Sequence, residues 1–248
     1  MSSNIETGHA KNVANFATII SFCKGYGASY NPSKSALQLS SLDTQKTEAE
    51  AALNAVKAAK ASFDTIVNSR QSAFKDLQSL STRIVNALAA CDVDPAVVAD
   101  AKTILRKIRG TRAHAAVTVP HDESNSNGST PDKKISTAQT SFDSLTDHLA
   151  KLIQLLTKQP GYKPNETDLT VIKLNDVLKD MQTGNADVVN AYTDWSNSRI
   201  NRNNVLYNSL TGMVQTAMDI KLYVKSVFGA SSPQFKQVGK IGFTSKAN

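Results

Sequence analysis

Residues 33–94 read SKSALQLSSLDTQKTEAEAALNAVKAAKASFDTIVNSRQSAFKDLQSLSTRIVNALAACDVD and contain neither Gly nor Pro. A seven-residue spacing runs through this segment at Leu42, Ala49, Val56, Phe63, Arg70, Leu77, Ile84 and Cys91. A largely apolar heptad pattern predicts one long amphipathic helix, or two long helices that share a bend, paired with another helix as in a coiled coil. A softer version of the spacing follows at Leu174, Met181, Val188, Trp195 and Arg202.

The composition agrees with a helical protein. The 248 residues include only 11 Gly and 7 Pro, which disfavours an all-β chain with many tight turns. No run approaches the ~20 apolar residues of a membrane-spanning helix. The N-terminus lacks a basic stretch followed by a long apolar run, so we expect a cytoplasmic protein. Its two cysteines, Cys23 and Cys91, are expected to be reduced and buried.

A polar segment with Gly and Pro divides the chain near its middle. Residues 117–135 include the run PHDESNSNGSTP, which offers no apolar face to bury. We interpret this segment as a flexible linker. The predicted domains are therefore a first helical half at 1–116 and a second at 136–248.

The two halves resemble each other when they are aligned without a gap at one constant offset in residue number. The matched pairs include Tyr30 and Tyr162, Pro32 and Pro164, Phe63 and Trp195, and Arg70 and Arg202. We interpret the matches as an internal duplication, with the Tyr-x-Pro loops defining the repeat. The alternative is two unrelated helical halves that share heptad spacing by chance. The predicted fold is all-α, an elongated helical bundle built from two pseudo-equivalent halves.

Each half is expected to follow the same order of elements. A short amphipathic helix, at about 9–24 or 138–158, precedes the loop and the long helix. A terminal helix then begins at Pro95 or Pro233, after the N-cap residue Asp94 or Ser232. The first of these terminal helices should end at Gly110.

Three finer expectations concern the long helices. Pro32 and Pro164 are predicted to begin them, because the missing N–H of proline costs nothing at the first helical position. The weak points expected in the second half are Gly184–Asn185 and Gly212, and the Asn-rich residues 197–204 are the expected place for a bend. Phe63 and Trp195 are expected to fill equivalent core sites.

Arg70 and Arg202 occupy the inward-facing heptad position of their halves. A charged residue at such a position costs stability and can fix register or partner choice. One interpretation is a buried polar layer in which each Arg pairs with a carboxylate or a carbonyl. The other is that the helix bends nearby and both side chains are exposed.

Each half ends in a basic segment. The first, within 102–112, contains Lys102, Arg106, Lys107, Arg109 and Arg112, and the second, within 221–246, contains Lys221, Lys225, Lys236 and Lys240. These cations could bind the phosphates of nucleic acid or an anionic membrane surface. They could also simply complement the negative ends of helix dipoles.

Residues that would support catalysis are sparse. The four histidines, His9, His114, His121 and His148, are scattered, and no metal-ligand spacing, Walker motif or calcium loop occurs. We therefore expect no enzyme activity, no cofactor, no metal site and no small-molecule substrate.

The leading functional hypothesis is a non-enzymatic structural or interaction protein that self-associates or scaffolds protein partners. An Ala-rich stretch in the first long helix would permit close approach of another helix. One alternative is an anion-binding module that uses the two basic segments. A second alternative is a membrane-active, toxin-like helical protein, which would need a concealed apolar hairpin; the weakly apolar residues 206–227 fit that role poorly.

Overall fold

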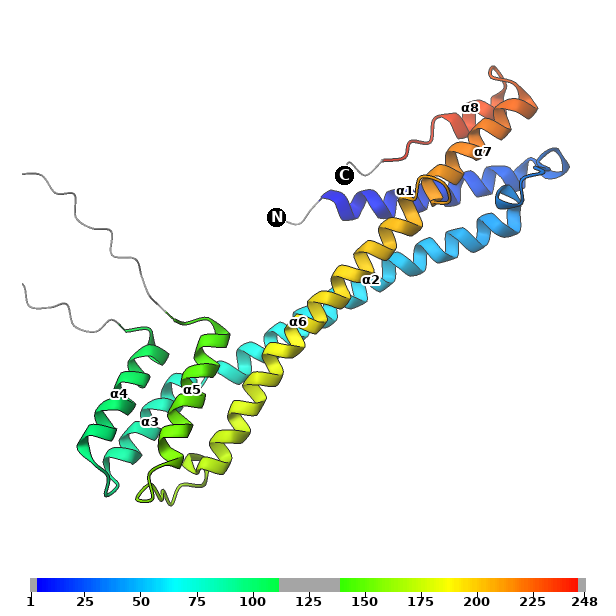
Figure 1. Ribbon diagram of the computed structural model, residues 1–248. Coiled ribbons are helices and arrows are strands. Elements are labelled where there is room, and N and C mark those ends of the chain that lie inside the picture. Colours follow the sequence, from blue (N-terminus) through cyan, green and yellow to red (C-terminus); the bar gives the residue numbers. More distant parts are fainter. Residues whose placement is uncertain (1–3, 112–138, 245–248) are drawn as a thin grey trace, which may run out of the picture. The chain divides into compact units, whose positions relative to one another are not determined.

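The computed structural model describes residues 4–111 and 139–244 (Figure 1). All regular structure in these two ranges is helical, which confirms the predicted all-α class. The α-helices are α1 (Asn4–Gly25), α2 (Leu39–Phe74), α3 (Leu77–Ala89), α4 (Pro95–Arg109), α5 (Phe142–Thr157), α6 (Val171–Tyr207), α7 (Met213–Phe228) and α8 (Pro233–Gly239). Short 3₁₀ turns are η1 (Gly27–Ser29), η2 (Ser35–Leu37) and η3 (Thr167–Leu169). The predicted linker at 117–135 and the basic residue Arg112 lie outside the described residues.

The chain divides into two compact units. The first unit lies within residues 1–64 and 190–248, and the second within 65–189. The first contains α1, the beginning of α2, the end of α6, α7 and α8; the second contains the end of α2, α3, α4, α5 and the beginning of α6. Each unit therefore combines helices from both sides of the central segment at 117–135.

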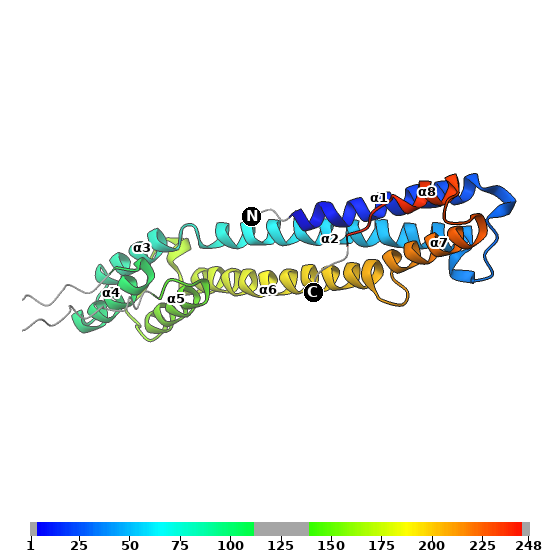
Figure 2. The same cartoon turned by 90° about the horizontal axis from the view of Figure 1, so that it is seen from above.

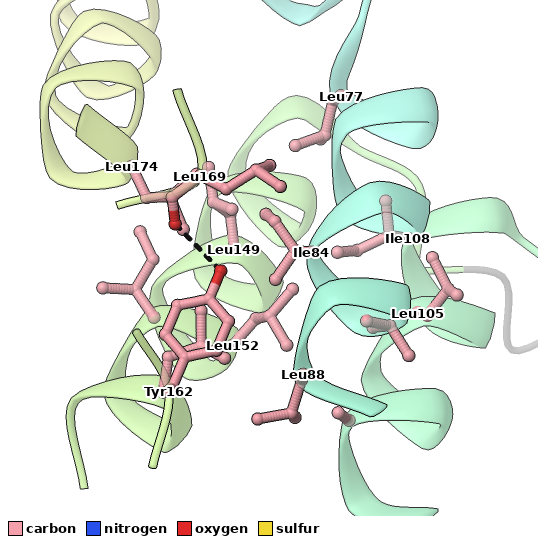
Figure 3. Packing of buried hydrophobic residues seen from close by; sticks show 14 of the residues in the cluster. Leu77, Ile84, Leu88, Leu105, Ile108, Leu149, Leu152, Tyr162, Leu169 and Leu174 are labelled. Carbon is pink, nitrogen blue, oxygen red and sulfur yellow. Dashed lines mark hydrogen bonds between the residues drawn. The ribbon is translucent and has the colours of Figure 1, made fainter. Parts of the chain in front are cut away.

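The second unit is built around α3, α4 and α5, which lie side by side (Figures 1 and 2). Its core joins Ile84 and Leu88 of α3 to Ile108 of α4 and to Leu149 and Leu152 of α5 (Figure 3). These side chains recur at helical spacing, so each helix buries one apolar stripe.

The first unit has its own core. The buried side chains of α1 include Phe16, Ile19 and Cys23, and those of α7 include Ala217 and Ile220. Val13, Ile20, Tyr30, Leu37, Leu42, Ala49, Leu206, Met213, Val224 and Val238 complete this core.

The loops that carry Tyr30 and Tyr162 have matching geometry. Tyr30 Oη donates to the Leu37 carbonyl at 2.9 Å, and Tyr162 Oη donates to the Leu169 carbonyl at 2.8 Å (Figure 3 shows the second). Both leucines are buried and end a 3₁₀ turn, after which α2 or α6 begins. The tyrosines, the 3₁₀ turns and the beginnings of the two long helices are all related by the same offset in residue number.

The prediction that Pro32 and Pro164 begin the long helices is wrong. α2 begins at Leu39 and α6 at Val171, beyond the 3₁₀ turns η2 and η3. Burying a leucine in the turn and satisfying its carbonyl with a tyrosine hydroxyl outweighs the local preference of proline for the first helical position.

The terminal helices begin as predicted. The Asp94 carboxylate accepts a hydrogen bond from the Ala96 N–H at 2.8 Å, and Pro95 is the first residue of α4. Ser232 Oγ accepts from the Phe235 N–H at 3.1 Å at the beginning of α8. At the other end of α4, Gly110 has φ 66°, a left-handed conformation that glycine adopts without strain.

The breaks in the long helical segments lie away from the Asn-rich tract. Residues 33–94 form the two helices α2 and α3, which part between Phe74 and Leu77. α6 continues through residues 197–204, so the bend predicted there is wrong. The tract stays helical because it carries the buried Arg202 and is followed by the buried Leu206, so that its packing outweighs the weak helix propensity of Asn.

The break in the second half lies at Gly212, one of the two predicted weak points, whereas α6 continues through the other, Gly184–Asn185. A Cβ at Gly212 would lie 2.5 Å from the Asn208 nitrogen, so this close turn requires glycine. Asn208 Oδ1 accepts from the N–H groups of Leu210 and Thr211 at 3.0 and 3.1 Å and closes the turn before α7.

Candidate interaction surface

Three aromatic side chains of the first unit form a cluster that we call the aromatic patch: Phe63 of α2 with Tyr192 and Trp195 of α6. The rings of Phe63 and Trp195 stack with centroids 5.5 Å apart and an interplanar angle of 24°. Tyr192 lies edge-on to Trp195 at 6.1 Å and is tilted against Phe63 at 6.0 Å. The patch therefore joins the two long helices within this unit.

The aromatic patch faces solvent in part. Phe63 and Trp195 are half-buried and Tyr192 is 53% exposed, so the expectation that Phe63 and Trp195 fill core sites is wrong. The two rings cover each other instead of entering the apolar core. Ile200, eight residues beyond Tyr192 on α6, is 64% exposed as well.

Two cations border the aromatic patch. Lys60 Nζ lies 5.4 Å from the centroid of the Trp195 ring, and the Arg199 guanidinium lies 5.3 Å from it. Lys60 also forms an ion pair with Asp64, one turn further along α2. Cation–π contacts at exposed sites are worth about 0.5–1 kcal/mol each. The two cations hold the Trp195 ring in place. Together with the carboxylate of Asp64, they put charges of both signs beside the patch.

The structure places Arg70 and Arg202 differently. Arg202 is 2% exposed, and its guanidinium donates to Asn203 Oδ1 at 3.0 and 3.3 Å. Arg70 is half-buried, and its guanidinium carbon lies 4.0 Å from the centroid of the Phe142 ring. The partner of Arg70 seen here is thus an aromatic face instead of the carboxylate or carbonyl considered from the sequence.

The basic residues of α4 lie on the surface. Lys102, Arg106, Lys107 and Arg109 are all exposed, and in the described ranges none of them forms an ion pair within 4.0 Å. Arg106 donates to Thr103 Oγ1 at 3.0 Å, and Arg109 donates to Thr82 Oγ1 of α3 at 2.6 Å. Both arginines lie in the last turn of α4, where cations also complement the helix dipole.

The basic residues near the C-terminus have separate surroundings. Lys221 is half-buried and donates to the Ile241 carbonyl, and its burial lowers its pKa. Lys225, Lys236 and Lys240 are exposed, and Lys225 Nζ lies 5.8 Å from the centroid of the Phe235 ring. Lys221 is therefore engaged inside the unit, whereas the other three face solvent.

Of the two cysteines expected to be buried, Cys23 is buried and Cys91 is half-buried, so the expectation is wrong for Cys91. Burial raises the pKa of the Cys23 thiol to about 11, so this thiol stays protonated near neutral pH. His9 Nδ1 lies 2.5 Å from Tyr207 Oη. Across the described residues, His, Cys, Asp and Glu side chains do not gather in groups of three or more that could hold a metal ion.

Within residues 4–111 and 139–244, no helix has both the length and the apolar content that crossing a bilayer requires. Residues 206–227 are divided among the end of α6, the turn at Gly212 and most of α7. Comparisons of the chain with models of protein families, with curated proteins and with solved structures find no match.

The sequence did not single out Tyr192. It lies four residues from Val188 and three from Trp195, and Val188 and Trp195 follow the heptad. The signal in the sequence that could have pointed to an exposed aromatic side chain was that Tyr192 lies outside the predicted apolar heptad positions. The histidine and asparagine pair His9 and Asn12 was missed as well, because polar residues near a chain end usually face solvent.

Proposed function

We propose that this chain is a non-enzymatic interaction protein that associates with a second copy of itself through the aromatic patch. The observation that supports the proposal is the exposed ring of Tyr192 against the stacked pair of Phe63 and Trp195. Trp, Tyr and Arg are the residue types that most often dominate binding energy in protein interfaces.

The energetics favour covering this surface. Burying a large apolar side chain contributes about 1.5–3 kcal/mol. About half of the Tyr192 surface and about two thirds of the Ile200 surface are still exposed and could be buried. On α2, Ala55 and Ala58 are exposed as well. Their small side chains would let a helix of another molecule approach α2 closely.

A second copy suits the patch because its chemistry is self-complementary. Rings, cations and the carboxylate of Asp64 occur together within about two helical turns. In a symmetric dimer the same patch lies on both sides of the interface. Lys60 and Arg199 of one molecule could then face the rings or the carboxylate of the other.

Light scattering at increasing protein concentration tests this proposal. We expect the mass to rise above the 26.7 kDa of a single chain. The double variant Tyr192→Lys/Ile200→Lys should weaken association at least about tenfold, because it places two charges in the interface. The matched control is Ile172→Lys, which changes an exposed isoleucine of α6 in the second unit. A strict monomer at every concentration would contradict the proposal.

We further infer that the chain arose by internal duplication and that its long helices pair as coiled-coil segments. The duplication is supported by the matching loops of Tyr30 and Tyr162 and by the equal offset of the beginnings of α2 and α6. The pairing is supported by the burial of Leu42, Ala49 and Val56 at seven-residue intervals. A crystal structure in which the two loops do not superpose would contradict the duplication.

A second candidate function is binding of phosphate-bearing partners by α4. The specific observation is the group of exposed cations Lys102, Arg106, Lys107 and Arg109 on one helix. Binding to a DNA duplex should weaken by orders of magnitude between about 50 and 200 mM salt. The variant Arg106→Glu/Arg109→Glu should abolish it, and binding that is insensitive to salt would contradict this function.

A further inference from the structure

The last described residues of the chain are extended and are held by two helices of the first unit. We call residues 241–244 the C-terminal segment; it follows α8 and lies against α1 and α7 (Figure 1). An extended segment cannot satisfy its own backbone groups, so other parts of the molecule must supply the partners.

Two asparagines of α1 supply most of these partners. Asn12 Nδ2 donates to the Thr244 carbonyl at 2.9 Å, and Asn12 Oδ1 accepts from the Thr244 N–H at 2.9 Å. Asn15 Nδ2 donates to the Gly242 carbonyl at 2.6 Å. One face of α1 thus recognises alternate residues of an extended backbone.

Lys221 of α7 holds the segment from another side. Its ammonium donates to the Ile241 carbonyl and lies 5.4 Å from the centroid of the Phe243 ring. The side chains of Ile241 and Phe243 pack against the core of the first unit. The residues Asn12, Asn15 and Lys221, which we call the C-terminal docking site, therefore combine backbone recognition with contacts to two apolar side chains.

The C-terminal docking site is built to be occupied. Asn12 is 1% exposed and also donates to Tyr207 Oη at 3.2 Å, so its amide is fixed inside the unit. With the segment docked, the buried Asn12 amide has the hydrogen-bond partners that apolar contacts could not supply. The site therefore favours any extended segment of the right sequence over an empty state.

We propose that the C-terminal docking site binds the C-terminal segment of a second copy of this chain, so that two copies exchange these segments. Every copy carries the same residues, and residues 241–244 can leave one site and enter another without unfolding α8. Exchange preserves every contact of the segment, which makes it an inexpensive route to a dimer. The inference rests on the proposed self-association and assigns it a second contact.

The short segment constrains how the two copies would meet. The four residues 241–244 reach about 13 Å when extended at ~3.3 Å per residue, because Lys240 keeps the helical conformation of the α8 C-cap. Exchange would therefore bring the first units of two copies close together. α7 has exposed apolar side chains beside Lys221, with Leu222 66% exposed and Met218 also exposed. A second copy at that distance would cover these side chains, which adds a favourable contribution from apolar burial.

Disulfide trapping between two full-length chains tests the exchange. One chain carries Asn15→Cys and the other Gly242→Cys, both with Cys91→Ser, and the buried Cys23 is retained. A Cβ at Gly242 meets no atom within 4 Å, so the cysteine fits. We expect copper–phenanthroline oxidation of the mixture to give a mixed covalent dimer whose yield increases with protein concentration. The control chain carries Ser21→Cys, at an exposed position of α1, in place of Asn15→Cys.

A single chain that carries both Asn15→Cys and Gly242→Cys tests the geometry itself. Its thiols should form an intramolecular disulfide at low protein concentration. If that disulfide forms but the mixed dimer never exceeds the Ser21→Cys background, the proposed exchange is wrong. If the intramolecular disulfide does not form, both the docking contact and the exchange are wrong. Light scattering of the unmodified chain reports the proposed function separately. Association without a mixed dimer would leave the aromatic patch as the contact, and a strict monomer without one would overturn both proposals.

Discussion

The two compact units contain two similar sets of elements, which differ at one end. In each, a helix leads into a loop closed by a tyrosine hydroxyl, a 3₁₀ turn and the beginning of a long helix. Each unit also contains a helix that begins at a capped proline, which lies before these elements in the chain in the second unit and after them in the first. In the second unit this helix, α4, has 15 residues, whereas in the first unit α8 has 7 and is followed by the extended C-terminal segment.

This difference shows how backbone conformation determines which side chains are needed. Inside an α-helix the backbone N–H and carbonyl groups form hydrogen bonds with each other. α4 can therefore pack on its unit through apolar side chains alone, without polar side chains that bind its backbone. The extended C-terminal segment requires Asn12 and Asn15. At the corresponding positions of the second half, Ser144 and Asp147 make local contacts of α5, to Ser141 and Lys151.

The largest expected effect tests whether the two units unfold separately. Leu152→Ala removes a fully buried side chain of the second unit and should cost about 2–5 kcal/mol of unfolding free energy. Urea unfolding is followed by circular dichroism and by the fluorescence of Trp195, which is the only Trp of the chain and lies in the first unit. We expect an early phase in the circular dichroism and little change in the fluorescence midpoint.

The matched variant is Ile20→Ala, at the corresponding position in the core of the first unit. It should lower the fluorescence midpoint by a similar free energy. If both probes shift together in both variants, the chain unfolds as one cooperative body and the comparison of two separate units fails.

A smaller effect is expected from the polar contacts that distinguish the units. Asn12→Ala removes both hydrogen bonds to Thr244 and should cost about 1–3 kcal/mol. Amide hydrogen exchange of Thr244 should become fast, because the segment loses its main attachment. Ser144→Ala, at the corresponding position, should change stability by less than about 0.5 kcal/mol. Undiminished protection of the Thr244 amide in Asn12→Ala would show that the apolar contacts alone hold the segment.

The helix class and the capped starts of α4 and α8 could be predicted because they depend on local signals. Asp94, Pro95 and Gly110 act within a few residues of themselves. The continuity of α6 through residues 197–204 could not be predicted in this way, since it depends on the burial of Arg202 and Leu206. Tertiary packing outweighs the intrinsic propensity of a short polar tract.

The candidate surfaces were less accessible from the sequence. The constant offset between the halves pairs Phe63 with Trp195, but it carries no information on which side of the helices remains uncovered. Exposure of Tyr192 follows from the arrangement of helices around it. The role of Asn12 depends on a segment 232 residues away, a separation at which no local pattern gives a signal.

The smallest expected effect concerns one buried titratable residue. His148 of the second unit corresponds to Phe16 of the first, and both side chains are buried. Among the described residues, neither ring nitrogen of His148 has a hydrogen-bond partner. Burial lowers the pKa of His148, the nearby cations Lys107 and Lys151 also lower it, and the Asp147 carboxylate, 4.0 Å from Nδ1, opposes them.

Replacing His148 by the residue of the other unit should remove a pH dependence of the second unit. Because the folded pKa lies below the 6.5 of an exposed histidine, the unfolded chain binds the proton first as the pH falls. The stability contributed by neutral His148 is complete above about pH 6.5 and is lost as the pH falls toward the folded pKa. In circular dichroism, the urea midpoint of the second unit should therefore decrease from about pH 7.5 to about pH 5, and it should decrease less in His148→Phe.

The reciprocal variant Phe16→His should make the Trp195 transition of the first unit depend on pH in the same direction. Equal pH slopes for the wild type and His148→Phe would show that other groups, and not this histidine, set the acid sensitivity of the second unit.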